Sequence, residues 1–147
     1  MFIFEEFFTL MKILIINGPN LNLLGTREPE IYGNVSMEVY LRNLQNEFPK
    51  HQISYYQSNV EGEIINRIQK DDFDALVINP GAFTHYSYAI ADCLKNISKP
   101  KTEVHISNVY KREEFRQKSV TAVHTDGVLS GFGMNGYRLA VISFQAD

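Results

Sequence analysis

The chain has 147 residues, of which 44% are hydrophobic and 21% are charged, with 9 Gly and 5 Pro. This composition excludes collagen-like, low-complexity and largely disordered chains, and the length fits one domain with one core. The formal net charge of -3 gives no chain-wide cationic surface, so we expect neither nucleic acid nor an acidic membrane as a partner. Cys93 is the single cysteine and cannot form an internal disulfide, which favours a cytoplasmic protein.

The first ten residues, Met1 to Leu10, are apolar but lack the features of a targeting segment. They have no basic start, contain Glu5 and Glu6, and are far shorter than the ~20 residues that a membrane-spanning helix needs. A clean strand pattern begins at Met11. We therefore interpret residues 1–10 as an N-terminal extension or an alternative start, and residues 11–147 as a single domain.

The first predicted strand is Lys12 to Asn17, a short apolar run typical of a strand buried on both faces. Residues 18–34 contain three Gly and two Pro, too many for a regular element, and are predicted to form a long loop of the kind that often carries function. Ser36 has the character of an N-cap and Pro49 ends the helical pattern that follows, so we predict a helix from residue 36 to 48.

The rest of the chain alternates between strand and helix patterns. The predicted strands are 53–57, 74–79, 102–106 and 119–124, the predicted helices are 61–70 and 86–96, and residues 109–118 are predicted to be partly helical. Residues 127–144 fit an amphipathic helix, although Gly131, Gly133 and Gly136 each cost about 1 kcal/mol there. Short buried strands alternating with helices predict an α/β fold, a flavodoxin-like doubly wound five-stranded parallel sheet in the order 2-1-3-4-5.

In such sheets ligands bind beyond the carboxyl ends of the strands, so the residues that follow the first, third and fourth strands are the candidates for a site. They comprise neutral hydrogen-bonding groups, two histidines, three arginines and a tyrosine: Asn20, Arg27, Tyr32, Asn79, His85, His105, Ser107, Arg112 and Arg116. Arginine binds carboxylates in a bidentate manner, amides and hydroxyls bind alcohols, and His or Tyr can transfer a proton. This set suits a small polyhydroxylated anion.

Several other chemistries lack their sequence patterns. Neither GxxxxGKS/T nor GxGxxG follows the first strand, so nucleotide binding is not indicated. The four histidines are scattered without HxxxH or HExxH spacing, so we predict no metal site. The eight lysines fall at strand edges, helix ends or loops, where they stay protonated and unsuited to imine formation. Acid–base chemistry without a cofactor remains.

Four linked motifs resemble one family, type II 3-dehydroquinate dehydratase. They are NGPNLNLLG (residues 17–25), REPEIYG (27–33), NPGAFTH (79–85) and EVHISNVYKREEFR (103–116), and the similarity runs from about Met11 to the C-terminus. The resemblance implies a single catalytic flavodoxin-like domain that assembles as a dodecamer of trimers. It further implies reversible dehydration of 3-dehydroquinate to 3-dehydroshikimate through an enolate, without Schiff base, metal or cofactor, in the shikimate or quinate pathway.

The resemblance also implies the catalytic roles. Tyr32 matches the base, a tyrosinate; bringing its pKa from about 10 to 7 takes roughly 4 kcal/mol, which the nearby cation Arg27 is expected to supply. Asn20 matches the residue that holds a water against the enolate, and His105 matches the proton donor to the leaving hydroxyl. Glu103, two residues earlier on the same strand face, is expected to orient that imidazole.

The substrate-binding groups implied by the resemblance are Asn79, His85, Ile106, Ser107 and Arg116, with Ser107 near the substrate carboxylate. Asp92 matches a residue that the family contributes from the adjacent subunit, and Arg112 is expected to close the loop of Arg27 and Tyr32.

Ordinary structural roles compete with these assignments. For Asn17 we keep the turn role that Asn often has after a strand, and Gly18 is expected to permit a backbone turn. The alternative function is a non-catalytic flavodoxin-like module that binds a small anion for regulation.

Overall fold

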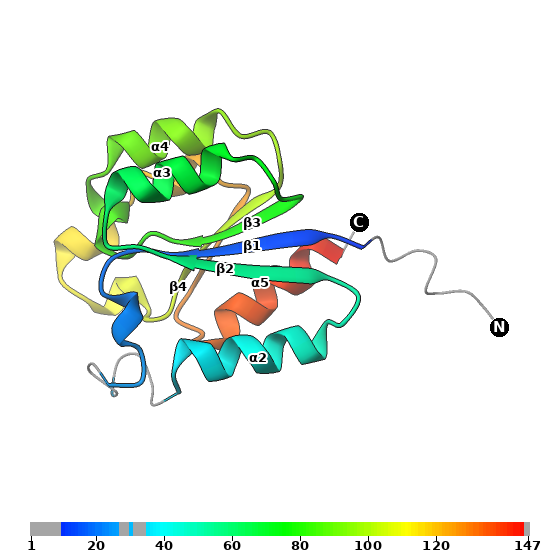
Figure 1. The fold of residues 1–147 in the computed structure, drawn as a ribbon. Helices are drawn as coiled ribbons and strands as arrows, with labels where there is room; N and C mark the ends of the chain where they lie inside the picture. The colour runs from blue at the N-terminus through cyan, green and yellow to red at the C-terminus, as the bar shows by residue number, and fades with distance from the viewer. Residues whose placement is uncertain (1–9, 27–29, 31–34, 146–147) are drawn as a thin grey trace.

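A five-stranded parallel sheet in the order β2-β1-β3-β4-β5 forms the centre of the protein (Figure 1). The structure is a computed structural model that describes residues 10–26, 30 and 35–145. The strands are β1 (Lys12–Asn17), β2 (Gln52–Gln57), β3 (Ala75–Asn79), β4 (Lys101–His105) and β5 (Gly127–Ser130). The predicted fold class and strand order are therefore confirmed.

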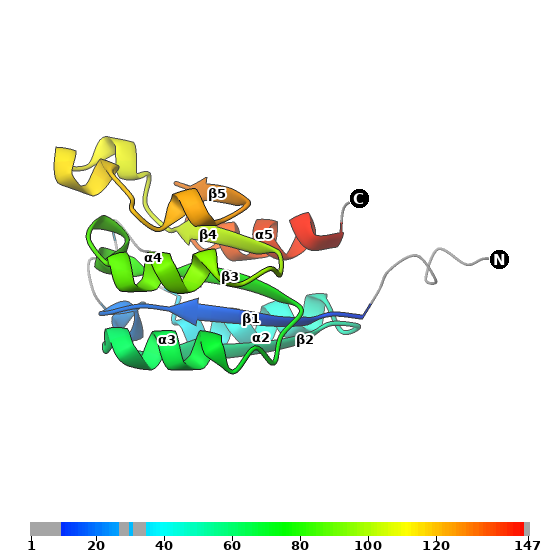
Figure 2. The ribbon, with the colours of Figure 1, turned by 90° about the horizontal axis from the view of Figure 1, so that it is seen from above.

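Helices cover both faces of the sheet, as the two views in Figures 1 and 2 show. α3 (Glu61–Gln69) and α4 (Tyr88–Lys95) lie on one face, and α2 (Met37–Glu47) and α5 (Asn135–Gln145) lie on the other. Because successive side chains of a strand point to opposite faces, β1 contributes to two separate apolar clusters. Ile13 and Ile15 pack toward α2 and α5, whereas Leu14 and Ile16 pack toward α3 and α4.

Two serines begin their helices as N-caps. Ser36 Oγ accepts a hydrogen bond of 3.3 Å from the backbone N–H of Val39, and Ser87 Oγ accepts one of 3.0 Å from Ile90. Each bond satisfies one of the backbone N–H groups that a helix start leaves without a partner. The helix predicted for residues 36–48 is confirmed, with α2 ending one residue earlier.

The predictions for the last strand and the start of the last helix are wrong. Residues 119–124 do not form a strand: they end in a 3-10 turn, η6 (Ala122–His124). β5 lies further along, where Thr102 of β4 pairs with Gly127, a residue predicted to be helical. Gly131 and Gly133 have φ values of 94° and 60°, which separate β5 from α5 and prevent one helix from spanning residues 127–144.

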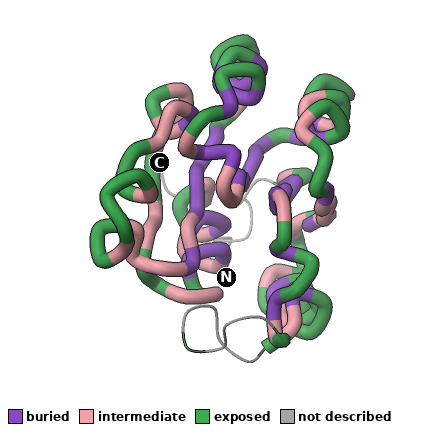
Figure 3. Tube along the Cα trace, turned by 90° about the vertical axis from the view of Figure 1, so that its left-hand side faces the viewer, coloured by how far each residue is buried: buried purple, intermediate pink, exposed green. Residues whose placement is uncertain are grey.

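Short 3-10 turns lie where the strands end. η2 (Leu21–Leu23) follows β1, η3 (Gly81–His85) follows β3, and η4 (Val109–Lys111) and η5 (Glu114–Gln117) follow β4. Figure 3 views the protein from this side, the left-hand side of Figure 1, toward which β1 points. The polar segments that follow β1, β3 and β4 therefore meet at one edge of the sheet.

Gly18 holds the loops after β1 and β3 in contact. Its N–H donates a hydrogen bond of 2.8 Å to the carbonyl oxygen of Asn79. A Cβ atom at this position would lie within 3.0 Å of the Pro80 carbonyl oxygen, so the position requires glycine for space. Its role is close approach of two backbones, not the turn that we expected from the sequence.

We expect Gly18→Ala to destabilise the protein by about 1–3 kcal/mol, because the Pro80 backbone must move to admit the methyl group. Urea unfolding measures the change. The matched control is Gly62→Ala in α3, where a Cβ meets nothing within 4 Å and the better helix propensity of Ala should stabilise by roughly 0.5–1 kcal/mol. Equal effects of the two substitutions would contradict the steric explanation.

Candidate functional site

A polar cavity lies at the carboxyl ends of β1, β3 and β4. It is lined by Pro19, Asn20, Leu21, Asn79, Gly81, Ala82, His85, His105, Ile106, Ser107, Val109, Arg112 and Arg116. Eight of the eleven predicted site residues are in this lining, from four separate segments of the chain. These eight residues therefore lie together at the edge of the sheet where ligands bind in folds of this kind.

Arg27 and Tyr32 lie outside the described residues. Asp92 is exposed on α4 and does not line the cavity of its own chain.

Asn20 sits on the cavity wall in a left-handed backbone conformation, with φ 68° and ψ -3°. Asn tolerates this region better than most residues. Its backbone N–H donates a hydrogen bond of 3.0 Å to Asn59 Oδ1 on the loop after β2. That bond anchors the start of the loop, and the Asn20 side chain makes no capping hydrogen bond to η2.

Two arginines give the cavity its positive charge. Arg112 Nη1 lies 3.5 Å from Ser107 Oγ, a long contact between two lining side chains. Arg116 Nε lies 2.9 Å from Glu113 Oε2, and the Arg116 guanidinium stands 4.8 Å from the centre of the Phe115 ring. A partly buried pair of guanidinium groups beside a hydroxyl is suited to an anionic ligand.

His85 is oriented by the segment that follows η5. Its Nδ1 lies 2.7 Å from the carbonyl oxygen of Lys118, and because a carbonyl only accepts, Nδ1 carries the hydrogen. In the neutral ring, Nε2 then presents a lone pair. The His85 ring also packs edge-on against Phe115, with 6.1 Å between ring centres. Phe115 therefore contacts both His85 and Arg116.

His105 is held by a buried carboxylate. Its Nε2 lies 2.7 Å from Glu103 Oε2, and the Glu103 side chain is 0% exposed. Three hydroxyls also bind that carboxylate: Thr121 Oγ1 donates to Oε1 at 2.5 Å, and Thr84 Oγ1 and Ser119 Oγ lie 3.0 and 3.2 Å from Oε2. Glu103 thus contacts His105 as the sequence led us to expect.

His105 and the hydroxyl groups together set the ionisation of Glu103. Burial alone raises the pKa of this carboxyl, but the hydrogen bonds from His105, Thr121 and Thr84 and the charge of His105 outweigh it, and the net pKa is lowered. The side chain is therefore an anion near neutral pH. The Glu103 carboxylate, hydrogen-bonded to Nε2 of His105, compensates the positive charge of the imidazolium that exists when Nδ1 is also protonated.

The sequence analysis missed these three hydroxyl residues. Ser119 and Thr121 fell in the incorrectly predicted strand 119–124, and Thr84 follows β3 as an ordinary loop residue. Periodicity does not indicate which of the many hydroxyl side chains reach Glu103.

Asn17 was interpreted as a turn residue, and this is wrong. Its side chain is fully buried beneath the cavity, where Asn17 Oδ1 accepts a hydrogen bond of 2.7 Å from the hydroxyl of Tyr137. Tyr137 comes from α5, 120 positions later in the chain.

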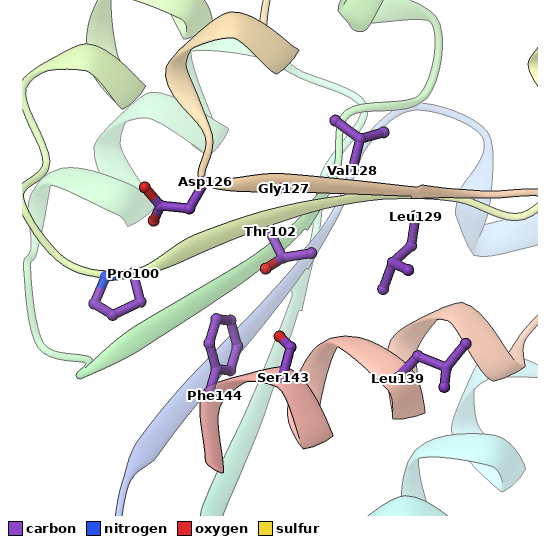
Figure 4. A pocket seen from close by; sticks show the side chains of 9 residues that line it. All are labelled: Pro100, Thr102, Asp126, Gly127, Val128, Leu129, Leu139, Ser143 and Phe144. Atoms are coloured by element: carbon purple, nitrogen blue, oxygen red, sulfur yellow. The ribbon is translucent and has the colours of Figure 1, made fainter. Parts of the chain in front are cut away.

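A wider hollow of about 470 Å³ lies at the opposite end of the sheet, between the beginnings of β4 and β5 and the end of α5 (Figure 4). It is lined by Pro100, Thr102, Asp126, Gly127, Val128, Leu129, Leu139, Ser143 and Phe144. Asp126 is its one carboxylate, and Asp126 Oδ2 already accepts a hydrogen bond of 2.9 Å from the backbone of Lys101. The groups capable of proton transfer line the smaller cavity instead.

Two further features concern the described part of the chain only. None of its helices has the length and apolar character needed to cross a membrane. In the same ranges, His, Cys, Asp and Glu side chains do not gather in groups of three or more that could hold a metal ion.

The sheet order and the cavity define a flavodoxin-like α/β protein with a small-molecule site at the carboxyl ends of its strands. Residues 11–145 match the family model described as dehydroquinase class II. The chain therefore belongs to the class II dehydroquinase family.

Individual relatives agree with this assignment. The 3-dehydroquinate dehydratase of Thermotoga petrophila is 55% identical over 133 residues, covering 89% of this chain and 92% of the relative. That of Carboxydothermus hydrogenoformans is 54% identical over 138 residues, covering 90% and 89%. The crystal structure of type II dehydroquinase from Butyrivibrio crossotus has a TM-score of 0.90 at 48% identity, covering 93% of this chain and 99% of that one.

The lowered pKa of Glu103 predicts an acid-dependent loss of stability. The stability that its ionised form contributes is complete above the ordinary value of 4.5 and is lost as the pH falls through the lower folded value. Below pH 4.5, the free energy of unfolding should fall more steeply in the wild type than in Glu103→Gln, by at most about 1.4 kcal/mol per pH unit.

Urea unfolding at several pH values measures both slopes. Glu38→Gln, at an exposed position of α2, serves as the control and should change the slope less. Parallel curves for wild type and Glu103→Gln would refute the ionised state of the buried carboxylate.

Proposed function

We propose that this protein catalyses the reversible dehydration of 3-dehydroquinate to 3-dehydroshikimate through an enolate, without a Schiff base or a metal. The observation that carries the proposal is the pairing of His105 with the buried Glu103 at the wall of a cavity that also holds two arginines. The names of the relatives support it, since those from Thermotoga petrophila and Carboxydothermus hydrogenoformans are called 3-dehydroquinate dehydratase.

The substrate is a ring that bears a carboxylate, a ketone and several hydroxyls. Arg116 and the hydroxyl of Ser107 supply charge and hydrogen bonds for the carboxylate, together with the backbone of Ile106. Asn79 and His85, which also line the cavity, bind ring hydroxyls, and His85 can accept a hydrogen bond on Nε2. Neutral groups for the alcohols and cations for the acid match the two ends of this substrate.

His105 acts as the proton donor to the leaving hydroxyl. Expelling hydroxide from a ring carbon is unfavourable unless the oxygen is protonated as it leaves. While Glu103 stays hydrogen-bonded to Nε2, the His105 ring transfers the proton from Nδ1 and becomes neutral. The same hydrogen bond still orients the neutral ring.

Tyr32 acts as the base, and Arg27 holds it in the phenolate form. One described residue between them in the chain supports this assignment: Glu30 lines a hollow together with Ile106, Ser107 and Arg112, which also line the main cavity. Glu30 therefore lies beside the wall that we propose to bind the substrate carboxylate. Arg112, on that wall, closes the segment of Arg27 and Tyr32 over the ligand.

The enolate intermediate needs a hydrogen-bond donor and not a covalent amine. Asn20 holds a water against the enolate oxygen, where negative charge exists only during the reaction. None of the eight lysines, all of them in the described residues, lines this cavity. Lys101, the lysine of β4, is buried, and its amino group donates hydrogen bonds to the carbonyl oxygens of Ile97 and Lys99, away from the site.

The remaining proposals concern assembly and context. Asp92, exposed on α4, reaches the site of a neighbouring subunit in a dodecamer built from trimers. The reaction belongs to the shikimate or quinate pathway, and the single cysteine, Cys93, buried without a disulfide, is consistent with a cytoplasmic enzyme.

Incubation of the purified protein with 3-dehydroquinate tests the function directly. The product contains a conjugated enone, so ultraviolet absorbance should rise at neutral pH. No rise would favour the non-catalytic anion-binding module. Borohydride added with the substrate should not inactivate the enzyme, and a covalent adduct would refute the mechanism without a Schiff base.

Tyr32→Phe removes the proposed base and should lower kcat by about 10²–10⁴-fold, the usual contribution of a positioned acid or base. Steady-state kinetics on the absorbance assay measure the loss. Tyr56→Phe is the matched control: Tyr56 is half-buried on β2 and lies outside the cavity lining, and its loss should leave kcat within about twofold. Equal kcat for Tyr32→Phe and wild type would remove Tyr32 from the mechanism.

Arg27→Met removes the cation proposed to lower the pKa of Tyr32. The rate should suffer more than binding, with kcat falling by at least about tenfold while KM changes less, and the activity should recover as the pH rises toward about 10. A pH–rate profile of variant and wild type measures this shift. Identical profiles would show that the Tyr32 phenolate does not depend on Arg27.

A further inference from the structure

A chain of buried hydrogen bonds runs beneath the floor of the cavity. The Tyr137 hydroxyl donates to Asn17 Oδ1 at 2.7 Å, and Asn79 Nδ2 donates to the Tyr137 hydroxyl at 3.0 Å. Asn17 Nδ2 in turn donates to the Tyr55 hydroxyl at 3.3 Å. Tyr137 and Asn17 are 0% exposed and Asn79 is 3% exposed, so water does not supply alternative partners.

The bonds determine which way the Asn79 carboxamide faces. Its Oδ1 accepts a hydrogen bond of 3.1 Å from the backbone N–H of Gly81, which can only donate. The Tyr137 hydroxyl has one hydrogen, already given to Asn17, so it accepts from Asn79 Nδ2. A flipped carboxamide would place its NH₂ group against the Gly81 N–H and lose that bond.

The hydroxyl of Tyr137 keeps its proton under ordinary conditions. Burial raises the pKa of Tyr137 far above its ordinary value, outweighing the opposing hydrogen bonds from Asn79 and Asn17. The direction of the bonds in the chain is therefore constant. Of the two N–H groups of Asn79 Nδ2, one is bound to Tyr137, and the second is left by these contacts for the cavity that Asn79 lines.

We propose that Tyr137 is a positioning residue for the substrate: it fixes Asn79 so that the carboxamide offers an N–H to the ligand. Asn79 then selects a ligand oxygen that can accept a hydrogen bond at this place. The inference rests on the proposed function, because it concerns how the same site binds 3-dehydroquinate. It assigns a role to α5, which contributes no residue to the cavity lining.

The test is a double-mutant cycle of Tyr137→Phe and Asn79→Ala, with kcat and KM measured for 3-dehydroquinate. Tyr137→Phe keeps the ring, which packs beside Tyr40 with 6.1 Å between ring centres, and deletes only the hydroxyl. We expect KM to rise about 5–15-fold with a smaller change in kcat, as for a lost binding contact. In the Asn79→Ala background the same substitution should change KM less than about twofold, since its effect passes through Asn79.

The KM readout separates positioning from loss of structure. Tyr137→Phe leaves Asn17 Oδ1 without a donor and lowers stability, but a fraction of unfolded enzyme lowers kcat and leaves KM unchanged. Tyr40→Phe is the matched control, because its ring is the neighbour of Tyr137 while its hydroxyl takes no part in the hydrogen bonds that join Tyr137, Asn17, Asn79 and Tyr55. Its KM should equal that of the wild type.

Two results would overturn the inference. One is an unchanged KM in Tyr137→Phe. The other is a KM increase on Tyr137→Phe that has the same size in the wild type and in the Asn79→Ala background. Absence of turnover by the wild type would instead refute the proposed function. In that case, calorimetric binding of 3-dehydroquinate tests the inference. Tyr137→Phe should weaken the affinity by the factor expected above for KM. Equal affinities of variant and wild type, or no binding by the wild type, would overturn the inference.

Discussion

The charge of Glu103 in the interior is the constraint on which the site depends. A carboxylate without solvent is unfavourable by several kcal/mol unless every lone pair has a partner. Here the partners are Thr84 from η3, His105 from β4 itself, and Ser119 and Thr121 from the segment after η5. These segments must therefore be in place together, and the stability of the buried charge and the orientation of the imidazole have the same cause.

Much of the fold follows from local patterns, because they coincide with burial. β1 and β3 are nearly continuous apolar runs, as strands covered on both faces must be. Ser36 identifies the start of α2, because its side chain caps the first turn by accepting a hydrogen bond from the Val39 N–H. β5 violates these patterns. It is a four-residue edge strand that begins with an exposed Gly127 and Val128, so it has neither the length nor the apolar character that identifies a strand.

The same reasoning explains which site residues were predicted. The motifs place Asn20, Asn79, His85 and His105 after strand ends, and the topology brings them together. The residues that orient them are different, since Ser119 and Tyr137 are 16 and 58 positions from their partners. Composition gives no reason to select one hydroxyl among many, and only the packed chain determines which of them meets a buried amide or carboxylate.

The segment from Lys118 to Thr121 has a practical consequence for anyone who alters this protein. Its carbonyl at Lys118 orients His85, the Val120 N–H donates to the Thr84 carbonyl at 2.7 Å, and its hydroxyls bind Glu103. A graft, an affinity tag or a loop exchange inserted there would disturb two histidines of the cavity at once. Engineering that aims to retain activity should therefore leave these four residues intact and place insertions at the distant turn between α2 and β2, around Lys50.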